Sequence, residues 1–269
     1  MLGIQVWEHL MRANYHTHTT RCHHAVGTER EYIEQAIREG LTILGFSDHV
    51  PMPYKSNIRM DQSQIEDYVQ TLLSLREEYE DTIDILIGYE VEYTHKYFDR
   101  MMNEITKYPV DYLIQGQHFV PDEVHGVYEG APTSDEKILK DYVDFTIEGM
   151  KTGVFSYLAH PDLINFHGDS KIYLKHMERL ITAANDLDLP LEVNMYGFID
   201  KRIYPNSLFF DLASKMDSRF VIGCDAHYPG LVVQPEKLPG FTDFLKKHHI
   251  TVGDNIVDLK SVSNSARSH

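Results

Sequence analysis

Short apolar runs recur along the whole chain and are nearly continuous rather than alternating with polar positions. They fall at residues 12–16, 43–48, 83–91, 112–118, 154–160, 189–194 and 220–225. Continuous apolar character is typical of strands buried on both faces, as in a parallel sheet covered by helices. The pattern therefore predicts seven parallel strands.

Helical patterns occupy the gaps between these runs. Thr28 and Glu31 have the spacing of a capping box before a helix that Gly40 would end. Asp61 and Gln64 open a second helix in the same way. Further helices are expected from about residue 134, over about 172–185 and after Pro205. Strands that alternate with helices indicate a βα barrel or a doubly wound sheet.

The 269 residues show no internal repeat and no long Pro/Gly/Ser linker. A βα barrel of about 200–250 residues forms one domain, so we expect a single domain over 1–269. Residues 1–10 and 261–269 are expected to be peripheral to it.

Composition excludes several classes of protein. There are 25 Lys and Arg against 41 Asp and Glu, a net charge of −16 that disfavours nucleic acid as a partner. No run of about 18 apolar residues predicts a membrane span, and the first sixteen residues lack the pattern of a secretory signal. Two cysteines are too few for a disulfide framework, which favours a cytoplasmic location.

Histidine and acidic residues stand at the ends of the predicted strands. They are His16, His18, His49, Glu90, His118, His160, Asp225 and His227. A lone histidine at a strand end is usually a core or capping residue, but six strand ends carry such residues here. Because the carboxyl ends of barrel strands converge on one face, we expect these side chains to meet in one cleft.

The spacing within this set indicates a metal site. His16 and His18 are two residues apart, so on an extended chain both imidazoles point the same way. Asp225 and His227 repeat the spacing. Imidazole and carboxylate without thiolate suit zinc, iron or manganese. Cys22 and Cys224 lack a Cys-His-Asn arrangement, and we expect neither to be a nucleophile.

An ordered set of motifs resembles the PHP (polymerase and histidinol phosphatase) family over nearly the whole chain. The motifs are HTH at 16–18, His24, SDH at 47–49, GYE at 88–90, QGQH at 115–118, LAHPD at 158–162 and CDAH at 224–227. The resemblance implies a distorted seven-stranded (β/α)7 TIM-like barrel that holds three divalent metal ions. The length is similar to that of the stand-alone histidinol-phosphate phosphatases of the family.

Carried over residue by residue, the resemblance implies three ligand groups. The first metal would be held by His16, His18, Glu90 and Asp225. The second would be held by Glu90, His118 and His160. The third would be held by His24, His49 and His227.

Such a centre suits hydrolysis of a phosphate monoester. The resemblance implies that this monoester is L-histidinol phosphate. Arg202 is the predicted phosphate-binding fork, with Arg21 the second choice. Asn194 is expected either to contact the ligand or to cap its strand, and Phe119 to lie near the substrate.

The catalytic residues would be Glu90, Asp225 and His227. The identity of the general acid stays open, with Asp225 slightly preferred over His227, because both are also predicted ligands and a metal-bound carboxylate is a poor proton donor.

Three alternatives stay open. Another PHP phosphoesterase would act on nucleotides or oligonucleotides, but a nuclease should carry a basic track. A metal-dependent amidohydrolase barrel usually needs a bridging lysine carbamate or carboxylate, and no lysine ends a predicted strand. A non-enzymatic metal-binding protein would need no phosphate-binding arginine. The sequence leaves the oligomeric state open.

Overall fold

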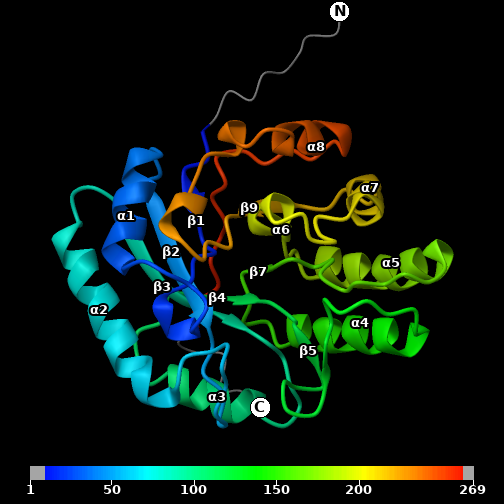
Figure 1. Cartoon of the computed structure of the whole chain (residues 1–269), viewed down its shortest axis with the longest axis horizontal. Coiled ribbons are helices and arrows are strands. Elements are labelled where there is room, and N and C mark those ends of the chain that lie inside the picture. The colour runs from blue at the N-terminus through cyan, green and yellow to red at the C-terminus, as the bar shows by residue number, and fades with distance from the viewer. Residues whose placement is uncertain (1–9, 263–269) are drawn as a thin grey trace, which may run out of the picture.

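The computed structural model describes residues 10–262. Within this range seven parallel strands form one sheet, as the apolar runs predicted (Figure 1). In spatial order the strands are β1 (Ala13–Asn14), β2 (Ile43–His49), β3 (Asp84–Val91), β4 (Tyr112–Gln115), β7 (Tyr157–Leu158), β8 (Leu191–Asn194) and β9 (Phe220–Gly223). With the helices around the sheet, the fold is a distorted (β/α)7 TIM-like barrel.

Helices follow the strands and cover the sheet. The α-helices are α1 (Glu29–Arg38), α2 (Ile65–Glu78), α3 (Phe98–Ile105), α4 (Glu136–Lys151), α5 (Ser170–Asp186), α6 (Met195–Ile199), α7 (Ser207–Lys215) and α8 (Phe241–Lys247). The 3₁₀ helices are η1 (Thr20–Cys22), η2 (Gln62–Gln64), η3 (Pro229–Leu231) and η4 (Pro235–Lys237). The capping boxes of Thr28 with Glu31 and of Asp61 with Gln64 are both present.

The barrel closes along a seam between β1 and β9. Near the base, the Asn255 side chain donates to the carbonyls of Ala13 and Ile222, each at 2.8 Å, and accepts from the Ile222 amide at 2.7 Å. At the carboxyl end, Thr17 and Ala226 form a parallel β-bridge. Backbone pairing therefore closes the seam beside the predicted ligands, and the side chain of Asn255 fills it near the base of the barrel.

Several elements differ from the predictions. The strands are mostly shorter than the apolar runs, because the chain leaves the sheet before it reaches the predicted ligands. The antiparallel hairpin of β5 (Phe119–Val120) and β6 (Val127–Tyr128) was not predicted, nor were α3, α6 and α8. Val262 is buried in the core rather than peripheral, whereas residues 1–9 and 263–269 lie outside the described range.

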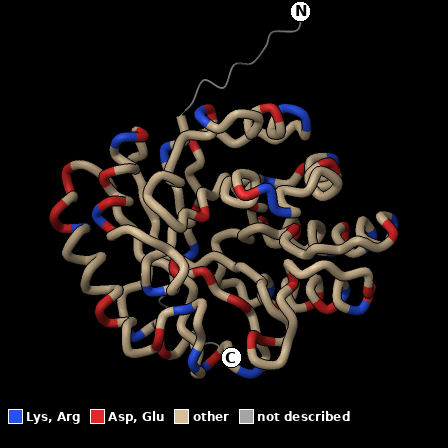
Figure 2. The backbone as a smooth tube through the Cα atoms, viewed as in Figure 1, with Lys and Arg blue, Asp and Glu red and all other residues tan. Residues whose placement is uncertain are grey.

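Charged residues of both signs are spread along the chain. Figure 2 shows Lys and Arg interspersed with Asp and Glu along the helices. Among residues 10–262, no helix is long and apolar enough to cross a membrane.

Candidate metal centre

The nine predicted ligands gather at the carboxyl ends of the strands, where the barrel strands converge. They come from the segments that follow β1, β4, β7 and β9, from the ends of β2 and β3, and from the turn after η1. These segments are distant in sequence, so the parallel topology alone brings them together.

The first ligand group is His16, His18, Glu90 and Asp225. The Nε2 atoms of both histidines face one oxygen of each carboxylate. His18 Nε2 lies 3.1 Å from Asp225 Oδ1 and 3.6 Å from Glu90 Oε2. His16 Nε2 lies 3.5 Å from each of the same two oxygens. Four donor atoms thus converge on one point.

The second ligand group is Glu90, His118 and His160. Glu90 Oε1 lies 2.7 Å from His160 Nε2 and 3.5 Å from His118 Nε2. Glu90 therefore turns one oxygen to each of the first two groups. This requires a glycine at position 116, because a Cβ there would lie 1.9 Å from Glu90 Oε1.

The third ligand group is His24, His49 and His227, whose donor atoms lie within 4.8 Å of one another. Nδ1 of His24 and Nδ1 of His227 each bond a backbone carbonyl two residues earlier, at 2.7 and 2.9 Å. Their Nε2 atoms face each other at 3.0 Å. His49 Nδ1 lies 2.9 Å from Glu90 Oε2, which links this group to the other two.

The donor set fits divalent metal ions. Among the described residues, His16 Nε2, His18 Nε2 and Glu90 Oε2 are buried and have no hydrogen-bond partner. Buried polar atoms without partners are costly, and a cation at the point where they converge would satisfy them together. Imidazole nitrogen and carboxylate oxygen are ligands for zinc, manganese and iron.

Carboxylates behind the ligands fix the orientation of their rings. Nδ1 of His16 bonds Glu192 at 2.8 Å, and Nδ1 of His118 bonds Glu92 at the same distance. A proton held on Nδ1 leaves the Nε2 lone pair free for a metal, as is usual for histidine ligands. Glu192 was missed by the sequence analysis. Its signal was a charged residue inside the buried strand Leu-Glu-Val-Asn.

The pKa values of both proposed general acids, Asp225 and His227, are lowered. Burial would raise the pKa of Asp225, but the neighbouring His16 and His18 hold it well below its ordinary range. Burial and then the charge of His18 lower the pKa of His227 to about 3. The His227 Nδ1 proton is used by the carbonyl of Asp225. Lowered pKa values suit metal ligands better than proton donors. They argue against the preference for Asp225 as the general acid.

A cavity of about 310 Å³ opens above the ligands. Its floor is formed by predicted ligands: His24, His49, His118, Asp225 and His227. Its wall is mostly aromatic and consists of Ile58, Phe119, Tyr128, Tyr196, Arg202 and Tyr204. The three tyrosines were not predicted from the sequence, because no pattern separates a tyrosine at a cavity from one in the core.

Arg202 and Phe119 both lie on this wall. The Arg202 guanidinium stacks 4.7 Å from the centre of the Tyr196 ring, and its Nε donates to Asp200 at 2.9 Å. Phe119 packs against Tyr128, with the ring centres 5.6 Å apart.

Arg21 is not brought to the cavity. Its guanidinium is paired with Glu29 and donates to Asp67 from Nε at 3.1 Å. The second choice for the phosphate-binding arginine is therefore held away from the cavity lining by two carboxylates.

Asn194 is a buried cap rather than part of the cavity lining. Its Oδ1 accepts from the Gly197 amide at 2.8 Å, which caps α6. Its Nδ2 donates to Asp225 Oδ2 at 3.1 Å and to Glu192 Oε2 at 2.9 Å. Its effect on the site is to fix the carboxylate of Asp225.

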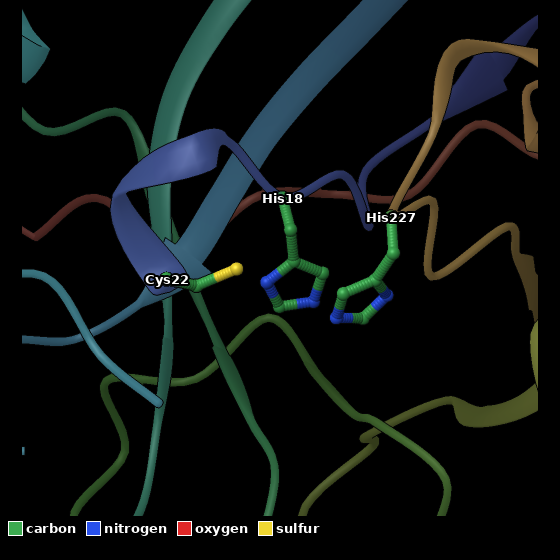
Figure 3. A group of neighbouring side chains, drawn as sticks. All are labelled: His18, Cys22 and His227. Atoms are coloured by element: carbon green, nitrogen blue, oxygen red, sulfur yellow. The ribbon is translucent and has the colours of Figure 1, made fainter. Parts of the chain in front are cut away.

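Cys22 lies at the edge of the cluster. In Figure 3 its sulfur points toward the His18 ring, with His227 on the other side of that ring. Burial and then Asp48 raise the pKa of the thiol, so the thiolate is disfavoured. Cys224 is also buried, and its pKa is raised to about 12. Neither thiol belongs to the three ligand groups.

Comparison with known proteins gives the class of the chain. The family model described as the PHP domain matches residues 14–196. The chain belongs to the PHP family.

Its relatives include proteins named as histidinol-phosphatases. A Deinococcus radiodurans protein named a probable histidinol-phosphatase is 28% identical over 81% of this chain and 86% of its own length. A Schizosaccharomyces pombe protein of the same name is 24% identical, with 81% of each chain covered. The histidinol phosphate phosphatase of Lactococcus lactis, solved with zinc, L-histidinol and phosphate, has a TM-score of 0.69 and 17% identity. The match covers 92% of this chain and 99% of that one.

Proposed function

We propose that the protein is a metal-dependent phosphoric monoester hydrolase that converts L-histidinol phosphate to L-histidinol and phosphate in histidine biosynthesis. The observation that carries this proposal is the convergence of unpartnered buried donor atoms of His16, His18 and Glu90 beside an open cavity with an arginine on its wall. The names of the curated relatives support the choice of substrate.

The three ligand groups would hold three divalent ions, of zinc, manganese or iron. Divalent metals in such a site lower the pKa of an attacking water and neutralise charge on phosphoryl oxygens. Glu90, Asp225 and His227 contribute to catalysis as ligands in this proposal. Because both cysteines are free, we also propose a cytoplasmic location.

The cavity wall would bind the two ends of the substrate differently. The guanidinium of Arg202 is a planar fork that matches the phosphate group. Phe119 and the tyrosines Tyr128 and Tyr204 offer flat apolar surface for an imidazole ring. Arg202 also makes the proposal distinguishable from simple metal storage, which needs no anion-binding group.

The test is steady-state phosphate release from L-histidinol phosphate, p-nitrophenyl phosphate and a nucleoside monophosphate, on protein assayed for metal content. We expect kcat/KM for L-histidinol phosphate to exceed the other two values at least a hundredfold. Equal and weak activity on all three substrates, with metals present, would contradict the substrate assignment. Oligonucleotides would then be assayed.

A further inference from the structure

Arg59 is a fully buried cation beside the cavity, on the segment between β2 and η2. Its Nη2 lies 2.6 Å from Glu92 Oε1, and its Nε donates to Glu123 Oε2 at 3.0 Å. A buried guanidinium is tolerated only when paired carboxylates offset its desolvation. Glu92 follows β3, and Glu123 lies in the turn of the β5–β6 hairpin. Arg59 therefore joins two elements that are distant in sequence.

The contact with Glu92 leads to the metal centre. The oxygen of Glu92 that faces Arg59 also bonds His118 Nδ1 at 2.8 Å and the His118 amide at 3.3 Å. These bonds orient His118 with Nε2 toward Glu90. Since Glu92 is itself buried, its position depends on the positive charge of Arg59.

The contact with Glu123 leads to the cavity wall. Glu123 also accepts from the Ser56 hydroxyl at 2.8 Å, so two residues of the β2–η2 segment hold the hairpin turn. The hairpin carries Phe119 and Tyr128 on the cavity wall, and Ile58 lies on that wall from the opposing segment. These bonds set how far apart the two sides of the wall lie.

We propose that Arg59 is a positioning residue that couples the metal centre to substrate selection. Through Glu92 it orients His118 for the second ligand group. Through Glu123 it holds the hairpin that carries Phe119 and Tyr128 against the organic part of the substrate. The second part rests on the proposed function, whereas the first concerns metal binding alone.

Two conservative variants separate these roles. Glu92→Gln weakens the support of His118, so we expect the affinity for Mn²⁺, measured by equilibrium dialysis without substrate, to fall about 10–100-fold. Glu123→Gln should leave Mn²⁺ affinity unchanged and raise KM for L-histidinol phosphate about tenfold, with kcat nearly unchanged. Hydrogen exchange of the amides of residues 119–128 should become faster in Glu123→Gln only.

Arg59→Met should show both effects, and Arg76→Met is its matched control. Arg76 is also paired with a carboxylate, Asp111, but it lies away from the cavity lining. We expect Arg76→Met to lower the thermal midpoint without changing Mn²⁺ affinity or KM. If Arg59→Met does not fold, the two glutamine variants decide the question.

The proposal is overturned if Glu92→Gln binds Mn²⁺ as the wild type does, or if Glu123→Gln leaves both KM and hairpin exchange unchanged. If wild-type protein does not hydrolyse L-histidinol phosphate, the proposed function fails by itself. Dialysis and hydrogen exchange then still test Arg59.

Discussion

The rings of His16 and His248 are both buried, and each bonds a carboxylate through Nδ1. His16 bonds Glu192 at 2.8 Å, and His248 bonds Asp211 at 2.6 Å in the corner between α7 and α8. The two rings differ in the groups that surround Nε2. His248 Nε2 meets the Ser207 hydroxyl at 3.1 Å, so both nitrogens of that ring are satisfied.

His16 Nε2 instead faces two more carboxylates, Glu90 and Asp225, and has no hydrogen-bond partner among the described residues. Neutral imidazole nitrogen and carboxylate oxygen are both acceptors, so this arrangement is satisfied either by a proton on Nε2 or by a metal cation between the groups. The comparison teaches that the surroundings of the second ring nitrogen distinguish a ligand from a packing residue. Burial and a carboxylate at Nδ1 are common to both rings and therefore do not distinguish them.

The largest effect is expected for Glu90→Gln, which keeps the shape of a side chain shared by two ligand groups. Metal content should fall, and kcat/KM should drop by more than about 100-fold, the upper range for residues that only support a ligand. Elemental analysis and phosphate release measure both quantities. A fully active, metal-loaded variant would remove the basis of the comparison.

Removal of the metal should lower the stability of the protein only by the loss of its binding at the carboxyl ends of the strands. Metal at 100 times its Kd contributes about 2.7 kcal/mol of stability. The thermal midpoint should then fall by about 5–10 °C after chelation and recover when Mn²⁺ is added. The same experiment on His248→Gln should give the same metal-dependent shift, because that ring binds no metal in our interpretation.

Metal affinity should weaken as pH falls. Burial alone would lower the pKa of His18, but the neighbouring carboxylates of Asp225 and Asp48 outweigh it and raise the pKa to about 9. Below about pH 9 the metal must displace this proton, so affinity should fall about tenfold per pH unit. His227, with its pKa of about 3, should release none. Calorimetry in two buffers with different ionisation enthalpies measures the protons released, and a value of zero would contradict this interpretation.

A smaller effect is expected on the cavity wall. Arg202→Met should lower kcat/KM for L-histidinol phosphate about 10–100-fold through the loss of charge-assisted hydrogen bonds, with metal content unchanged. Arg21→Met is the control, since that guanidinium is held by Glu29 and Asp67 outside the cavity. Equal losses in the two variants would show that general charge, rather than the position of Arg202, matters.

The smallest effect on activity is expected at the α7–α8 corner. His248→Gln should cost about 1–3 kcal/mol in the free energy of unfolding in urea, because Asp211 and Ser207 lose a partner. Its kcat/KM should stay within about twofold of the wild type. A loss of activity as large as that of Glu90→Gln would break the distinction between the two histidines.

The seven strands were predictable because their apolar runs are continuous, and the helices with clear caps, such as α1, were predictable for the same local reason. The β5–β6 hairpin was not, because each of its strands has only two residues. Likewise α6 has five residues and depends on a cap from Asn194. Short elements are stabilised by tertiary contacts that the local pattern does not contain.

For the site, motif order led to nine residues that the fold brings together, whereas the support that Glu192 gives to His16 was missed. Glu192 has no motif around it, and its role follows only from the distance to His16 across the barrel. The place of Arg21 was not predictable, because its proximity in sequence to His18 says nothing about Asp67, which holds its guanidinium from α2. Roles that depend on a partner far along the chain need the three-dimensional structure.

The seam of the barrel has a consequence for how the centre comes into being on the ribosome. All nine predicted ligands have been synthesised once His227 has been added, but Asn255, which joins Ala13 to Ile222, follows 28 residues later (255 − 227). A nascent chain of intermediate length therefore carries every ligand, and the Thr17–Ala226 bridge beside them, before Asn255 can fill the seam near the base. The base of the barrel is therefore completed only after all the ligands have been synthesised.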